Sequence, residues 1–158
     1  SSKLKNMKKT FILIWFLALS VIITSSSCSS DDDDSGSNTN ATEILAIENT
    51  MESGNWRVTY FFDTDSEETS NYNSYNFSFD SDGTLTATNV TNTYTGTWSV
   101  TNSSSSDDID FNILFSAPAD FAELSDDWDI IAHTSTKIEL TDVSGGNGGI
   151  DFLTFQKN

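Results

Sequence analysis

The sequence predicts an all-β domain, either an antiparallel up-and-down barrel or a β-sandwich, preceded by a short helix. From Trp56 onward, apolar and polar residues alternate in short runs, which is the period of a strand with one buried face. Turn-forming Gly, Asp, Ser and Asn residues separate these runs. About eight such strands in succession are typical of a small barrel or sandwich.

The helix is predicted over residues 41–52. Ile44, Ile47 and Met51 recur there at helical spacing, and Gly54 is a stop signal. Because the helix is short, we expect its apolar side to pack on the end or flank of the sheet.

The first strand contains Trp56, Val58, Tyr60 and Phe62, which are expected on one face, with Arg57, Thr59 and Phe61 on the other. The other seven strands are predicted over residues 75–79, 85–87, 94–100, 109–115, 128–132, 138–140 and 150–155. Asp80-Ser81-Asp82-Gly83 predicts a tight turn that is closed by a positive-φ glycine. Such turns favour sequential hairpins.

One segment, residues 116–127, does not alternate. Pro118 blocks a ladder hydrogen bond, and Phe121 and Leu124 suit a helical turn. We expect this insert to cap one end of the barrel, where it is also the best place for a movable lid.

The N-terminal residues predict an export signal. Met7-Lys8-Lys9 is a basic segment, and the apolar run 11–23 is short for a bilayer span but typical of a secretory signal. Cys28, the chain's one cysteine, follows, and then Asp31, Asp32, Asp33 and Asp34. We therefore expect an upstream extension and signal peptide over 1–27, a disordered acidic tether over 28–40 and the β domain over 41–158.

This leader resembles that of Bacteroidota lipoproteins, in which signal peptidase II cuts before the cysteine and the thiol is acylated. The acidic run resembles the flavobacterial signal that sends a lipoprotein to the outer face of the outer membrane. The resemblance implies a lipid on Cys28, an export signal at Asp31 to Asp34, and a palmitate-type anchor at the cell surface. The alternative is an unmodified Cys28 thiol in an anchor that is not cleaved.

The β domain resembles the lipocalin-like domains of Bacteroidota lipoproteins. The shared features are Gly54-Asn55-Trp56 at the first strand, the hairpin 79–84, Gly96-Thr97-Trp98 and the closing strand around 153–157. The resemblance implies a lipocalin-like barrel with a short N-terminal helix.

Aromatic residues raise two alternatives for the barrel interior. Either they fill the core, or a cavity binds a small apolar molecule or a sugar. The residues predicted to line such a cavity are Tyr60, Tyr94, Trp98, Phe111 and Trp128. Trp56 is expected to plug the barrel, whereas Gly96 is expected to leave open space beside Trp98. The rival function is a structural or protein-interaction lipoprotein with a filled barrel, accessory to an outer-membrane complex.

The net charge of the chain and its lack of catalytic and metal-binding motifs limit the classes of function that we expect. From Cys28 onward the chain has 3 basic and 24 acidic residues, which gives a net charge of −21. This charge disfavours nucleic acid as a partner. An acidic ligand would need Arg57 or a cation in order to bind. No nucleophile motif or metal-type histidine spacing occurs, so we expect no enzyme and read His133 as an exposed strand residue. No cofactor is expected; structural calcium at 63–68, 80–82 or 125–129 is the inorganic alternative.

Overall fold

The computed structural model of the protein describes residues 35–104, 106–143 and 149–158. Its helical elements are α1 (Ser35–Glu52), the 3₁₀ helix η1 (Thr69–Tyr72) and α2 (Ala119–Ala122). Its strands are β1 (Trp56–Asp63), β2 (Ser66–Glu67), β3 (Asn76–Phe79), β4 (Thr84–Thr88), β5 (Thr93–Asn102), β6 (Ile109–Leu114), β7 (Asp126–His133), β8 (Lys137–Val143) and β9 (Ile150–Lys157).

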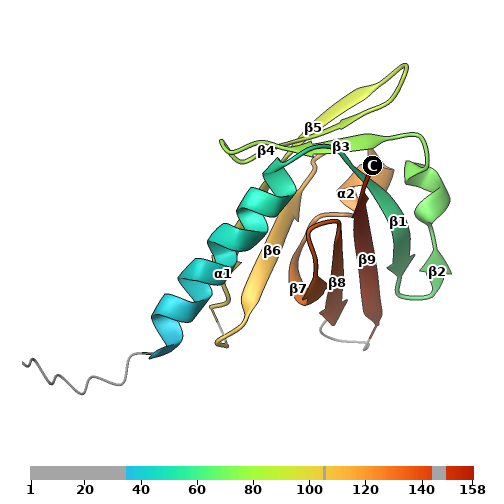
Figure 1. Ribbon diagram of the computed structural model, residues 1–158. Coiled ribbons are helices and arrows are strands. Elements are labelled where there is room, and N and C mark those ends of the chain that lie inside the picture. Colours follow the sequence, from blue (N-terminus) through green and yellow to red (C-terminus); the bar gives the residue numbers. More distant parts are fainter. Residues whose placement is uncertain (1–34, 105, 144–148) are drawn as a thin grey trace, which may run out of the picture. The chain divides into compact units, whose positions relative to one another are not determined.

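The strands form a closed antiparallel up-and-down barrel (Figure 1). From β3 to β9, every strand pairs with its neighbour in sequence, and β1 closes the ring by pairing with both β9 and β3. The two-residue strand β2 extends β1 at Phe62 and Asp63. The predicted barrel and all eight predicted strands are therefore confirmed, and the sandwich alternative is wrong.

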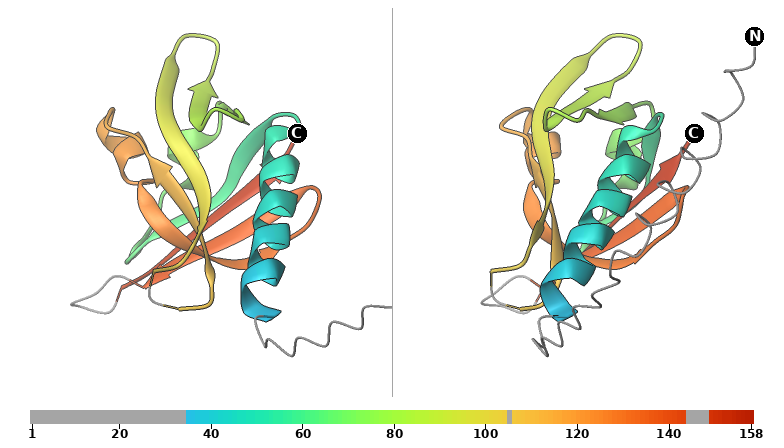
Figure 2. Two further views of the ribbon diagram at one scale, coloured as in Figure 1. Left: turned by 90° about the vertical axis from the view of Figure 1, so that its left-hand side faces the viewer. Right: turned by 60° about the vertical axis from the view of Figure 1, so that its left-hand side comes forward.

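Helix α1 covers the barrel end at which β5 and β7 end and β6 begins (Figure 2). Ile47 and Met51 are buried in the core. Glu43 Oε1 lies 2.6 Å from His133 Nε2 on β7. The helix ends before Gly54, whose φ of 91° is the left-handed conformation that the predicted stop signal requires.

The beginning of α1 differs from the prediction. Residues 35–40, expected to belong to a disordered tether, are helical. The Asn40 amide donates to the Asp107 carbonyl at 2.8 Å, so this polar segment has a tertiary contact. Extending an existing helix costs far less than nucleating one, which explains how a segment without an apolar face continues α1.

The opposite end of the barrel is closed by η1 and α2. Tyr72 from η1, Phe121 from α2 and Leu124 just after it are buried, and the rings of Tyr72 and Phe121 meet edge to face with centroids 5.4 Å apart. The prediction that the insert 116–127 caps one end is confirmed.

The interior between these two ends is filled by aromatic and aliphatic side chains. Each of the three tryptophans in the barrel also satisfies its indole N–H, because it donates to a main-chain carbonyl: Trp56 to Met51 at 2.8 Å, Trp98 to Asp80 at 3.0 Å and Trp128 to Leu124 at 3.0 Å. Buried indoles with satisfied donors are core residues that hold the end segments against the strands.

Candidate functional site

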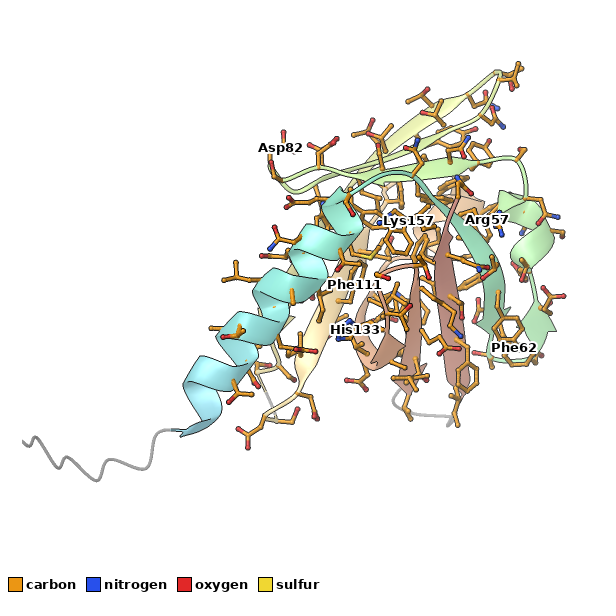
Figure 3. The ribbon with its side chains drawn as sticks, viewed as in Figure 1. Arg57, Phe62, Asp82, Phe111, His133 and Lys157 are labelled. Carbon is orange, nitrogen blue, oxygen red and sulfur yellow. The ribbon has the colours of Figure 1, made fainter. Side chains whose placement is uncertain are left out.

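Three of the five residues predicted to line a cavity lie in the filled core. Phe111 and Trp128 are fully buried, and Trp98 is only 6% exposed. The Trp98 and Phe111 rings lie 5.8 Å apart between centroids, and Phe79 contacts both. Figure 3 shows Phe111 on β6, on the barrel side of α1. These residues pack against one another and do not surround a shared cavity.

The space beside Trp98 is also filled. A methyl group on Gly96 would approach the Leu114 carbonyl oxygen to 2.3 Å and the Phe115 ring to 2.8 Å. The expectation that Gly96 leaves open space is therefore wrong. Glycine is required here because β5 and β6 approach each other closely.

Tyr94, the fourth predicted residue, belongs to the closed end of the barrel. Its ring lies 4.8 Å from the Phe121 ring and 5.8 Å from the Tyr75 ring, between centroids. A hydrogen bond with Tyr75, together with burial, raises the pKa of Tyr94. Tyr94 packs beside α2 and is separate from the other four.

Tyr60, the fifth, lies on the outside of the barrel. The pairing of β1 with β9 shifts register between Val58 and Tyr60, which is a β-bulge. After the bulge Phe61 is buried and Tyr60 is 41% exposed. The predicted alternation of β1 fails at this point because the extra residue reverses which side chains face the core.

The outer face of β1, β9 and β8 therefore carries a set of side chains in cross-strand rows, which we call the outer aromatic face. The register gives the rows Arg57–Gln156–Lys137, then Tyr60–Thr154–Glu139, then Phe62–Phe152–Thr141, with Ile150–Val143 last. The buried partners Leu140, Leu153 and Phe155 point to the opposite side of the same strands.

Aromatic rings form the centre of this face. The Tyr60 and Phe62 rings are nearly parallel, with an interplanar angle of 11° and centroids 6.5 Å apart. Phe152 stands opposite Phe62 on the neighbouring strand, and Ile150 and Val143 are 46% and 61% exposed. Phe62 and Phe152 are half-buried, and Tyr60, Ile150 and Val143 are exposed around them, so the face carries a group of partly exposed apolar side chains. Such a group suggests a contact surface, since isolated apolar residues would need no explanation.

The basic residues of the described chain also gather on these three strands: Arg57 on β1, Lys137 on β8 and Lys157 on β9. Lys157 lies over the Trp56 ring at 5.1 Å and donates to Ser53, at the α1 end of the barrel. Lys137 pairs with Glu139 at 3.0 Å. Figure 3 shows Arg57 and Phe62 toward opposite ends of β1.

Carboxylates crowd the barrel end that α2 covers. Partial burial, together with the nearby carboxylates Asp127 and Asp142, raises the pKa of Asp126 to about 6. Burial and a hydrogen bond shared with Glu68 raise the pKa of Glu123. With a pKa of about 6, Asp126 can hold a proton just below neutral pH. Glu123 directly follows α2, at the barrel end that the rings of Tyr72 and Phe121 close.

A groove of about 440 Å³ runs outside the barrel between α1 and the β6–β7 strands. Its lining combines apolar and ionisable side chains. The apolar ones are Ile47, Ile109, Ile130 and Ile131, and the ionisable ones are Glu43, Asp107, Asp108, Asp129 and His133. His133, expected to be exposed, is instead half-buried and bridges β7 to α1 through Glu43.

Within the described ranges, no three or more His, Cys, Asp or Glu side chains converge as a metal ion would require. This includes the described acidic segments 63–68, 80–82 and 125–129, which were the candidates for calcium. None of the helices in residues 35–158 that the structure describes is long and apolar enough to cross a membrane. Cys28 and Asp31, Asp32, Asp33 and Asp34, the predicted lipid attachment and export signal, lie outside the described residues.

Sequence reasoning missed Phe62, Phe152 and Arg57 as members of one surface. The apolar alternation of β1 assigned Phe62 to the core together with Trp56, and only the bulge separates them. The three basic residues were a usable signal, because Lys157 ends β9, which pairs with β1, and Lys137 begins β8, which pairs with β9.

No protein-family model matches the chain, and no curated protein matches it at a significant level. Among solved structures, the crystal structure of a DUF4847 family protein from Bacteroides vulgatus aligns with a TM-score of 0.45 and 18% sequence identity. The alignment covers 71% of this chain and 97% of that one.

Proposed function

We propose that the protein is a non-catalytic lipoprotein, anchored to the outer membrane at the cell surface through Cys28, that binds a glycan on its outer aromatic face. The observation that carries the proposal is the combination of a filled barrel with an outer face on which the ring of Tyr60 is exposed and the rings of Phe62 and Phe152 are half-buried. Since the core of the described barrel is occupied by its own side chains, binding is assigned to the outside.

The chemistry of this face suits a sugar. An aromatic ring presents an electron-rich face, which attracts the weakly positive C–H groups of a sugar ring. Thr154, Gln156 and Glu139 stand among the rings and supply hydroxyl, amide and carboxylate groups for sugar hydroxyls. A small apolar molecule fits less well, because such ligands bury most of their surface in a pocket.

The second candidate is a protein-interaction lipoprotein that is accessory to an outer-membrane complex. A filled interior with an exposed apolar face favours it as well, and Tyr and Arg are enriched among the residues that dominate protein interfaces. The strand-aligned rows of rings and polar groups favour an extended polymer over a globular partner.

Immobilised polysaccharides and biolayer interferometry test the proposal on residues 35–158, which form one compact unit with its own core. Dextran, xylan, starch, polygalacturonate, alginate and hyaluronate make a suitable panel. We expect at least one to bind, and Tyr60→Ala and Phe62→Ala to weaken binding about tenfold or more.

Thr95→Ala is the matched control, since Thr95 is exposed on β5 away from this face. Absence of binding to the whole panel, or an equal loss in the Thr95 variant, would refute the glycan proposal.

A further inference from the structure

We infer that the glycan is acidic and that Arg57 binds its carboxylate, with Gln156 and Lys137 beside it on the same row. This inference rests on the proposed function and specifies its ligand. Asp31 to Asp34 account for four of the chain's 24 acidic residues, so residues 35–158 contain 20 acidic residues and only three basic ones. A cation exposed on such a surface is unusual.

Arg57 is that cation. It is exposed on β1, and among the described residues its side chain makes no ion pair or hydrogen bond. Lys137 already pairs with Glu139, and Lys157 is held by Trp56 and Ser53. Arg57 is therefore the basic group that remains available, although 20 carboxylates of the same domain compete for it.

The position of Arg57 directs it toward a ligand on the outer aromatic face. Arg57 is opposite Gln156, and Gln156 is opposite Lys137, so the three side chains form one row across β1, β9 and β8. Adjacent strands are about 4.8 Å apart, which places Arg57 and Lys137 roughly 10 Å apart across the row. The next row begins with Tyr60, so a sugar stacked on that ring has its substituents near Arg57.

The chemistry of arginine selects the ligand group. The guanidinium presents a planar fork of N–H donors that matches the two oxygens of a carboxylate, and such charge-assisted bonds are stronger than neutral ones. A uronic acid residue supplies that carboxylate together with a sugar ring for Tyr60. The acidic field elsewhere on the domain repels a polyanion, so this face is where a uronic acid polymer can bind.

The test compares polygalacturonate with the same polymer after full methyl esterification, which keeps the sugar ring and removes the charge. Alginate and hyaluronate serve as further carboxylated polymers. We expect residues 35–158 to bind at least one carboxylated polymer, and to bind the acidic form of polygalacturonate at least about tenfold more tightly than the ester. Arg57→Gln should remove this preference, and Arg57→Lys should restore part of it.

Other results overturn the inference in distinguishable ways. Equal binding of acid and ester that Arg57→Gln leaves unchanged would refute the acidic ligand while the proposed glycan function stands. Tyr60→Ala should weaken both forms, because it removes the stacking ring and not the charge. If no polymer binds, and a photo-crosslinker at Phe62 captures a protein on whole cells, the face binds a protein and both proposals fail.

Discussion

Replacement of Trp98 by alanine tests whether the barrel is filled. The indole is 6% exposed, and its centroid lies 5.2 Å from that of Phe79 and 5.8 Å from that of Phe111. A tryptophan buries roughly 150–250 Å² of surface, which at about 25 cal/mol per Å² corresponds to about 4–6 kcal/mol. The substitution also leaves the Asp80 carbonyl without its 3.0 Å hydrogen bond. Some relaxation of the core is expected, so we predict a loss of about 3–5 kcal/mol.

Urea denaturation of residues 35–158, followed by tryptophan fluorescence and circular dichroism, measures this loss. Trp56→Ala provides the comparison for a core plug, since Trp56 is fully buried, and it should cost a similar amount. Tyr60→Ala is the surface control and should change the free energy of unfolding by less than about 1 kcal/mol. A loss at Trp98 of about 1 kcal/mol or less would show that its ring faces open space, and the argument for binding on the outer face would lose its basis.

Two further predictions concern pH and the membrane anchor. Because the pKa of Asp126 rises from 3.8 to about 6 on folding, this group stabilises the domain at low pH, and the contribution is lost as pH increases through about 6. The full shift corresponds to about 3 kcal/mol, which the partial exposure of Asp126 reduces to about 1 kcal/mol. Asp126→Asn should therefore raise the free energy of unfolding by about that amount at pH 7.5 and not at pH 3.5; an equal effect at both would contradict it. Cys28→Ala should release the protein from membranes or block its processing, and retention in the outer-membrane fraction after a carbonate wash would refute the lipid anchor.

The fold could be predicted from the sequence because its two main signals are local. Alternation with a period of two located the strands, and the Asp80–Gly83 turn showed that the strands follow one another as hairpins; Gly83 indeed has a φ of 84°. The insert with Phe121 and Leu124 was identified as a cap because its apolar residues lacked that alternation. Burial of both residues bears this out.

The site could not be predicted in the same way, because it depends on contacts between distant segments. The bulge in β1 is a property of its pairing with β9, about 95 residues further along the chain, as the Thr59–Thr154 hydrogen bond shows. The crowding at Gly96 arises from Leu114, the last residue of the neighbouring strand β6, and from Phe115 directly after it. Asn40, in the part of α1 that was expected to belong to the tether, donates to the Asp107 carbonyl from 67 residues away. None of these contacts leaves a periodic signal in the sequence.

The bulge in β1 connects the filled core to the proposed binding face. Before it, Trp56 and Val58 face the core; after it, Phe61 does, and its ring meets those of Tyr72 and Trp128 at centroid distances of 5.5 and 6.5 Å. Without the extra residue, the side chains of Tyr60 and Phe62 would point into the barrel and compete for space with the rings of Tyr72 and Trp128. Such overpacking destabilises a core. The same register change therefore completes the barrel interior and leaves two parallel rings on its outer surface. Strand β1 thus contributes Phe61 to the filled core and places Tyr60 and Phe62 on the outer face that also carries Arg57.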